Sequence, residues 1–143
     1  QMDILRDFTP QDIHDLKQKL TRKTVSKGEI IIKEGDTDRN LFLLAKGLVS
    51  VRIHLAESDR YKRLITYSAG VTFGEMAFLD GSPRSADIWS DEDSETYVLS
   101  PAEFKIFQNE SPQIAIKLVR NIALEISVRL RIRTNEVRIL EED

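Results

Sequence analysis

Glu75 and Arg84 are the two charged side chains best placed to do chemistry in residues 70–86, the most informative segment of the sequence. Gly74 directly precedes Glu75, and a glycine at this point permits a tight backbone turn. We expect a single helical turn over residues 75–79, and the unpaired amide groups at the start of such a turn can bind an anion. Arg84 follows a tight turn and carries a planar, two-pronged donor that suits phosphate. The segment therefore predicts an anion site.

Glu75 indicates which kind of anion would bind. A carboxylate repels a bare phosphate, but it is a strong acceptor for a sugar hydroxyl. Phosphate and ribose together point to a nucleotide. The small side chains of Ser85 and Ala86 would let the ligand approach the backbone closely. The simpler interpretation is a structural ion pair between Glu75 and Arg84, which could also form when no ligand is bound.

The two halves of this segment resemble the phosphate-binding cassette of the cyclic nucleotide-binding domain family. They read Phe73-Gly74-Glu75-Met76-Ala77 and Pro83-Arg84-Ser85-Ala86, with the usual gap between them. The resemblance covers nearly the whole chain and includes the turn glycines Gly35, Gly47 and Gly70. The Arg84-Ser85-Ala86 ending is most similar to bacterial catabolite-activator-type sensors.

The resemblance implies a role for each matching residue of the cassette, which spans residues 73–86. Glu75 would accept a hydrogen bond from the ribose 2′-hydroxyl, and Arg84 would pair with the cyclic phosphate. Backbone amides would hold the phosphate oxygens, helped by the Ser85 hydroxyl. The other cassette residues expected at the ligand are Gly74, Met76, Ala77 and Ala86.

Outside the cassette, the resemblance implies an apolar wall and a closing residue. Val51 and Leu64, on strands that line the roll in such domains, would contact the sugar and the base. Members of this family also close the site with a residue of the terminal helix. Arg129, Arg133 and Thr134 are the candidates here, and Arg133 is included among the expected ligand residues; an arginine could stack on a purine face.

Ser85 bears on the choice of nucleotide. A threonine at this position tends to accompany cyclic GMP selectivity in eukaryotic members, whereas serine followed by alanine is similar to bacterial cyclic AMP receptors. We therefore expect cAMP as the regulatory ligand, with cGMP as the alternative. No catalytic residues are expected. The alternatives are a nucleotide or sugar-phosphate enzyme that uses the same pocket, and a degenerate domain that only oligomerises.

The surrounding elements divide the chain into three parts. Residues 1–20 are predicted to be an N-terminal helical segment, with Thr9-Pro10 as a helix start. From residue 21 to 100 short β-branched segments alternate with glycine turns, which favours an all-β sandwich or barrel. Residues 101–143 are predicted to form two helices. With the resemblance, the expected fold is mainly β: an antiparallel double-stranded β-helix (jelly roll) with an N-terminal helix and a C-terminal helical pair.

The last predicted helix carries a coiled-coil seam, a row of mainly apolar residues at alternating spacings of three and four. The seam consists of Ile116, Val119, Ala123, Ile126, Leu130, Arg133, Val137 and Leu140. A second apolar stripe, formed by Ala115, Leu118 and Ile122, is confined to the first turns. We expect the early turns to pack on the β body and the later turns to need a partner helix, which predicts a homodimer. The alternative is a helix that lies along its own domain throughout.

Length and composition exclude several other functions. The chain has 143 residues, a net charge of −3 and no cysteine, which argues against non-specific nucleic-acid binding and removes thiol chemistry. His14 and His54 have no metal-ligand spacing. We expect a single cytoplasmic domain that contacts neither nucleic acid nor membrane, and that lacks the DNA-binding domain of catabolite-activator-type proteins. Its length suits a regulatory module whose output, such as a fused membrane or enzyme domain, lies elsewhere.

Overall fold

The structure, a computed structural model, describes residues 3–142 and the side chains of residues 4–141, so the outermost residues of the predicted terminal segments lie outside it. A short 3-10 helix η1 (Asp3–Leu5) and helix α1 (Pro10–Lys17) precede the β region. The strands are β1 (Thr21–Val25), β2 (Ile30–Ile32), β3 (Leu41–Lys46), β4 (Leu48–His54), β5 (Tyr61–Ser68), β6 (Thr72–Phe73), β7 (Asp87–Ser90) and β8 (Ser94–Leu99). Helix α2 (Glu75–Asp80) lies between β6 and β7, and α3 (Pro101–Glu110) and α4 (Pro112–Glu142) follow β8.

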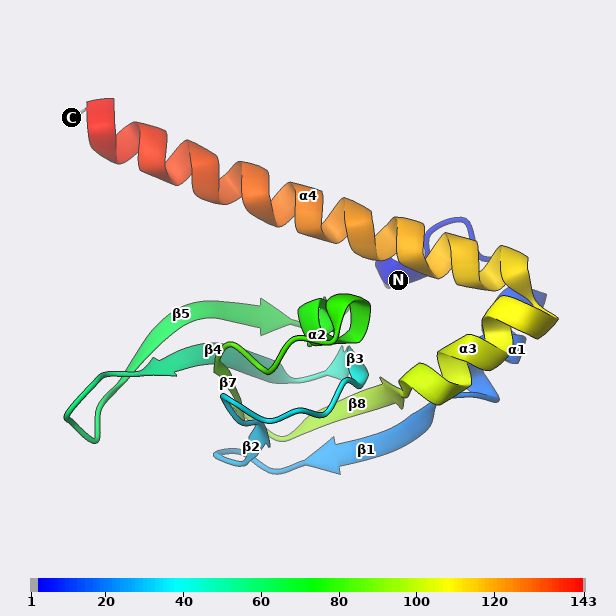
Figure 1. Ribbon diagram of the computed structural model, residues 1–143, viewed down its shortest axis with the longest axis horizontal. Helices are drawn as coiled ribbons and strands as arrows, with labels where there is room; N and C mark the ends of the chain where they lie inside the picture. The colour runs from blue at the N-terminus through cyan, green and yellow to red at the C-terminus, as the bar shows by residue number, and fades with distance from the viewer. Residues whose placement is uncertain (1–2, 143) are drawn as a thin grey trace.

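The strands form two four-stranded antiparallel sheets, in the orders β1-β8-β3-β6 and β2-β7-β4-β5. Helices α1 and α3 lie at one end of this roll, and α4 runs back above it (Figure 1). The architecture confirms the expected mainly β jelly roll with flanking helices.

Strand β3 is buried on both faces and separates two apolar clusters. Leu41 and Leu43 join a cluster of helix residues that includes Phe107 and Ile114. The alternate residues of β3 point the other way, and Phe42 stacks on Phe73 inside the roll at 5.0 Å between ring centroids. Successive side chains of a strand point to opposite faces, so this short apolar strand joins the helical end to the roll.

The N-terminal segment is not one helix. Thr9 accepts a hydrogen bond from the Asp12 amide, and the Asp12 side chain accepts one from the Thr9 amide, so α1 begins at the predicted cap. Before it, Asp7 adopts a left-handed backbone angle of 67°, which ends the helical path that begins at η1. The helical segment predicted over residues 1–20 is therefore interrupted between η1 and α1.

The first half of α4 is anchored on the molecule, as the second apolar stripe predicts. Ala115, Leu118 and Ile122 are buried in the cluster at the helical end. Asn121 donates hydrogen bonds to the carbonyls of residues 4 and 6, and Lys117 forms an ion pair with Asp12 at 2.6 Å. From residue 130 onward every described side chain of α4 is exposed.

Candidate functional site

The two halves of the cassette meet at a cavity of about 170 Å³. Its walls come from α2, from the segment between α2 and β7, and from strands β2, β4, β5, β6 and β7. The sequence-predicted residues that line it are Val51, Gly74, Glu75, Met76, Ala77, Arg84, Ser85 and Ala86. Ile32, Ile65, Tyr67, Phe73, Ser82, Pro83 and Ile88, which the sequence did not single out as ligand residues, complete the lining. Leu64 and Arg133 do not line this cavity.

Arg84 is buried, with 5% of its surface exposed. Its guanidinium donates to a carboxylate oxygen of Asp38 at 2.6 Å, to the Asn40 carbonyl at 2.7 Å and to the Gly74 carbonyl at 2.8 Å. The hydrogen bond from Arg84 lowers the pKa of Asp38. These partners hold the arginine beside the cavity, so the alternative ion pair between Glu75 and Arg84 is wrong.

Gly74 is the N-cap of α2 and has a backbone φ of 77°, in the left-handed region that glycine adopts without strain. A Cβ atom here would lie 2.9 Å from Nη1 of Arg84 and 3.2 Å from the Asn40 carbonyl oxygen. The glycine therefore serves both the turn into α2 and the close approach of Arg84.

Glu75 pairs with Arg129 of α4, at 3.2 Å between Oε1 and Nη1. Arg129 also donates to the Thr72 carbonyl at 2.6 Å, and its guanidinium lies 4.5 Å from the centroid of the Tyr67 ring. Of the helix candidates, Arg129 is thus the one that contacts the cassette. The exposed Thr134 bonds instead to the Leu130 carbonyl of its own helix.

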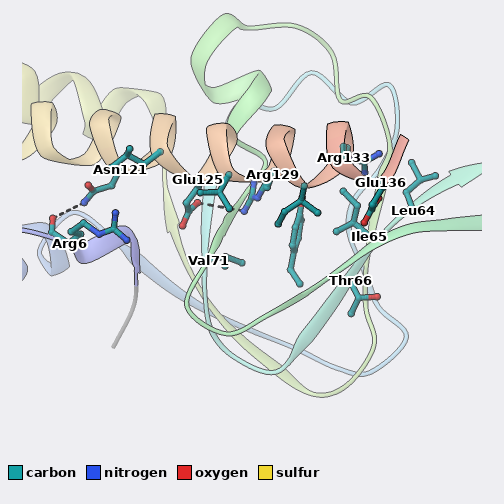
Figure 2. A pocket seen from close by; sticks show the side chains of 14 residues that line it. Arg6, Leu64, Ile65, Thr66, Val71, Asn121, Glu125, Arg129, Arg133 and Glu136 are labelled. Atoms are coloured by element: carbon teal, nitrogen blue, oxygen red, sulfur yellow. Dashed lines mark hydrogen bonds and ion pairs between the residues drawn. The ribbon is translucent and has the colours of Figure 1, made fainter. Parts of the chain in front are cut away.

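A groove of about 450 Å³ adjoins the cavity and lies between β5 and α4 (Figure 2). Ile65 and Tyr67 line both spaces, and Leu64 and Arg133 line the groove. The pairing of β4 with β5 shifts at this point, because Val51 faces Ile65 while Arg52 faces Arg63. Leu64 is the extra residue of a β-bulge, an irregularity that re-aims side chains.

Glu125 lines the same groove, one helical turn before Arg129. Its Oε2 accepts hydrogen bonds from the hydroxyl and the amide of Thr72, whereas its buried Oε1 has no partner. Burial raises the pKa of Glu125, and the hydrogen bond from Thr72 and the charge of Arg129 oppose this effect. Sequence reasoning missed Glu125 and Thr72 because neither stands out from its neighbours.

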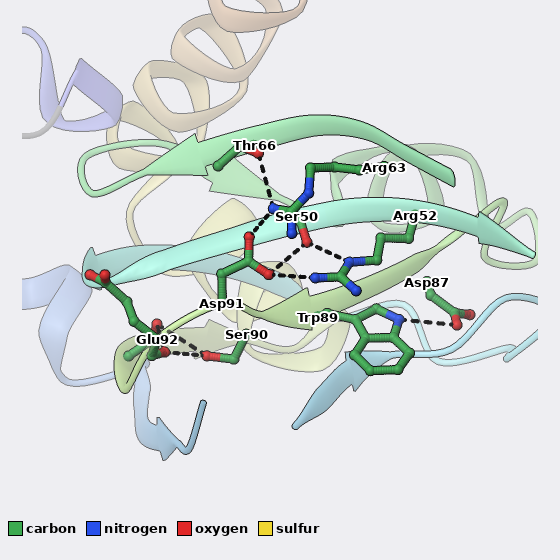
Figure 3. A network of polar contacts seen from close by, with 10 residues as sticks. Ser50, Arg52, Arg63, Thr66, Asp87, Trp89, Ser90, Asp91 and Glu92 are labelled. Atoms are coloured by element: carbon green, nitrogen blue, oxygen red, sulfur yellow. Dashed lines mark hydrogen bonds and ion pairs between the residues drawn. The ribbon is translucent and has the colours of Figure 1, made fainter. Parts of the chain in front are cut away.

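The opposite face of β4 carries a separate polar network (Figure 3). The carboxylate of Asp91 accepts hydrogen bonds from Arg52, Arg63 and Ser50. Although burial raises the pKa of Asp91, these bonds lower it overall. Arg52 also lies 4.8 Å from the centroid of the Trp89 ring. The single tryptophan therefore lies in this network, outside the lining of the cavity.

Within residues 3–142, which the structure describes, no cluster of three or more His, Asp or Glu side chains could hold a metal ion. Within the same range, no helix is long and apolar enough to cross a membrane.

Comparison with known proteins decides the family. Residues 22–111 match the model of the cyclic nucleotide-binding domain. The chain belongs to this family. The match covers the roll, the cassette and α3, and it ends where α4 begins. The family is regulatory and binds cyclic nucleotides, in agreement with the resemblance seen in the sequence.

The most informative relatives are bacterial proteins of different kinds. Glutaminase 1 of Bradyrhizobium diazoefficiens is 31% identical over 137 residues, which are 96% of this chain and 21% of that protein. The cyclic AMP receptor protein of Thermus thermophilus is 29% identical over 129 residues, 90% of this chain and 57% of the receptor. A cyclic nucleotide-binding domain from Methylobacillus flagellatus has a similar crystal structure, with a TM-score of 0.85, 23% identity and coverage of 96% of this chain and 75% of that one. The chain thus spans only part of the length of these relatives.

Proposed function

We propose that this domain binds one cyclic nucleotide in the cassette cavity and prefers cAMP to cGMP. Arg84 pairs with the cyclic phosphate, and Glu75 accepts a hydrogen bond from the ribose 2′-hydroxyl. The amides of Gly74, Ala77 and Ser85 hold the phosphate oxygens. The observation that carries this proposal is the cavity itself, because both halves of the cassette line it and its one buried arginine is Arg84. The serine at residue 85 and the similarity to a cyclic AMP receptor support the choice of cAMP.

The base of the nucleotide lies where the cavity meets the groove. Val51 lines the cavity and Leu64 the groove, so together they provide the apolar wall for sugar and base. Arg133 lines the groove from the α4 side and covers the base from there. The β-bulge in β5 supports this arrangement. It adds Leu64 beside Ile65, and β5 borders both the cavity and the groove.

The nucleotide acts by shifting the position of α4. Arg129 joins α4 to Glu75, so a ligand that engages Glu75 competes with this contact and favours another placement of the helix. The exposed seam of α4 forms a homodimer with a second copy, since Ile116, Leu130 and Leu140 expose 67%, 64% and 75% of their surface. In the cytoplasm, this movement passes the signal to an output domain.

An enzyme that uses the same pocket is the weaker alternative. A phosphodiesterase needs a metal cluster or a positioned base near the phosphate. Glu75 is the carboxylate that lines the cavity, and it already pairs with Arg129. The proposal therefore expects cAMP to be recovered unchanged after incubation with the protein, as chromatography can measure. The third alternative, a domain that only oligomerises, expects dimers that bind no nucleotide.

Replacing Arg84 tests the proposed phosphate contact. Arg84→Ala removes a charge-assisted hydrogen bond, so calorimetric titration with cAMP should show affinity weakened roughly tenfold or more. Arg60→Ala is the matched control, because Arg60 is an exposed arginine that lines neither the cavity nor the groove. Equal affinity of the Arg84→Ala variant and the unmodified protein would overturn the site assignment.

A further inference from the structure

Thr72, directly before the cassette, is the point at which α4 is tied to β6. It is fully buried and lies in β6, a strand at the edge of its sheet, directly before Phe73 and Gly74. Its amide and its hydroxyl both donate to Glu125, and its carbonyl accepts from Arg129. Two side chains of α4, one turn apart, therefore occupy all the polar groups of this edge residue.

Arg129 lies between two carboxylates. Its Nη1 is 3.2 Å from Oε1 of Glu75 on α2, and its Nη2 is 3.6 Å from Oε2 of Glu125 on α4. Glu125 precedes Arg129 by four residues, which is the favourable order for such a pair on a helix. The side chains of Arg129 and Glu125 expose only 20% and 10% of their surface, so both charges are poorly solvated.

The free oxygen of Glu125 is the unusual feature of this arrangement. Oε1 is buried and has no hydrogen-bond partner, although an unpaired buried acceptor is costly. The other oxygen of the same carboxylate, Oε2, already forms an ion pair with Arg129. A small rotation of the guanidinium could therefore bring a donor to Oε1.

We propose that Glu125 is a positioning residue. It accepts a hydrogen bond from Arg129 when a nucleotide binds to Glu75. This inference rests on the proposed function, in which the ribose 2′-hydroxyl donates to Glu75. Where the hydroxyl takes Oε1 of Glu75, it displaces Nη1 of Arg129, and one arm of a poorly solvated guanidinium left without an acceptor would oppose binding. The Oε1 atom of Glu125 accepts Nη1 instead, while Nη2 keeps the Thr72 carbonyl. The exchange leaves no charged group without a partner.

The exchange also explains how nucleotide binding in the cavity changes the placement of α4. Glu125 keeps its bonds to Thr72 in both states, so the helix stays attached to β6. Arg129 exchanges its contact with α2 for a bond to Glu125 within α4. The part of α4 after Arg129, whose described side chains are exposed, is then free to take another placement.

The Glu125→Gln variant tests this proposal through the sign of its effect. If Arg129 must move to a carboxylate, removing that charge weakens cyclic nucleotide binding roughly tenfold. If Glu125 acts only as a negative charge near an anionic ligand, the same substitution strengthens binding. Calorimetric titration of the full chain with cAMP and with cGMP distinguishes these results. Stronger or unchanged binding would overturn the proposal.

A second variant separates this role from a general effect on folding. In the proposal, Glu125→Gln weakens binding in the presence of Arg129 and has no effect in an Arg129→Gln background. An equal loss in both backgrounds would contradict the exchange. Glu141→Gln is the matched control, since it removes one charge from an exposed position of α4 and is expected to leave affinity unchanged.

A crystal structure of the unmodified protein with bound nucleotide provides a test that needs no variant. The proposal expects Arg129 within hydrogen-bond distance of Glu125 Oε1, with Glu75 bonded to the ribose. Arg129 still paired with Glu75 in that complex would refute the exchange and leave the proposed nucleotide site intact. If the unmodified protein bound neither cAMP nor cGMP, the proposed function itself would fail.

Discussion

At the scale of single residues, Gly74 and Arg84 depend on each other. The left-handed turn at Gly74 starts α2, and the absence of a Cβ atom there leaves room for the buried guanidinium. Asp38 and the carbonyls of Asn40 and Gly74 then fix the position of that guanidinium. Pre-positioned donors of this kind lower the cost of ordering a side chain when a ligand binds.

We predict that Gly74→Ala weakens cAMP binding at least tenfold. The substitution adds backbone strain of about 1–2 kcal/mol and places a methyl group 2.9 Å from Nη1 of Arg84. Calorimetry measures the affinity, and thermal unfolding measures the stability.

Gly81→Ala is the control for this backbone strain. Gly81 has a similar φ of 75° at the other end of α2, where the atoms nearest to an added Cβ belong to the side chain of Arg39. It should lower the melting temperature and preserve binding. Equal losses of affinity in the two variants would show that strain in α2, rather than contact with Arg84, accounts for the effect.

The cassette motif is visible in the sequence because its residues are contiguous, and both Glu75 and Arg84 line the cavity. Their partners were not predictable. Asp38 meets Arg84, and Arg129 meets Glu75, only because the chain folds back over 46 and 54 residues respectively. Nothing in the spacing of the sequence encodes such long-range pairs.

At the scale of elements, α4 has two different faces. One face packs on the helical end and overlooks the groove, whereas most of the seam is exposed; within the seam, Ile126 packs against the helical-end cluster and Arg133 lines the groove. The sequence predicts this division because both stripes follow helical periodicity. It does not predict β1, which is polar and mostly exposed, or β6, which has only two residues. The β-bulge at Leu64 was not predictable either, because it depends on how β5 pairs with β4 and the sequence of one strand does not show this pairing.

We predict that Leu130→Glu converts the proposed homodimer to a monomer. Leu130 exposes 64% of its surface, so the charge is tolerated in a free chain but not between two seams. Sedimentation velocity measures the change in mass. Asn135→Glu introduces the same charge on the opposite face of α4 and should leave the dimer intact. A monomeric unmodified protein, or dimers in both variants, would refute the seam as the interface.

At the scale of the whole molecule, the fold couples a ligand cavity to a long helix. Strand β3 joins the two apolar clusters, and the cassette lies between the roll and α4. The helical end holds the first half of α4, while Arg129 ties the next turns to the cassette and Glu125 ties them to β6. A ligand can therefore bias only the second half of the helix, and by no more than its differential affinity for the two placements.

The most direct test of this account is a calorimetric titration of the unmodified chain with cAMP, cGMP and the open nucleotide 5′-AMP. The account predicts one cAMP per chain, weaker binding of cGMP, and little or no binding of 5′-AMP, whose open phosphate lacks the cyclic shape. Tighter binding of cGMP would contradict the choice of base. The absence of binding heat with either cyclic nucleotide at millimolar concentration would contradict the central claim that the cassette is a cyclic nucleotide site.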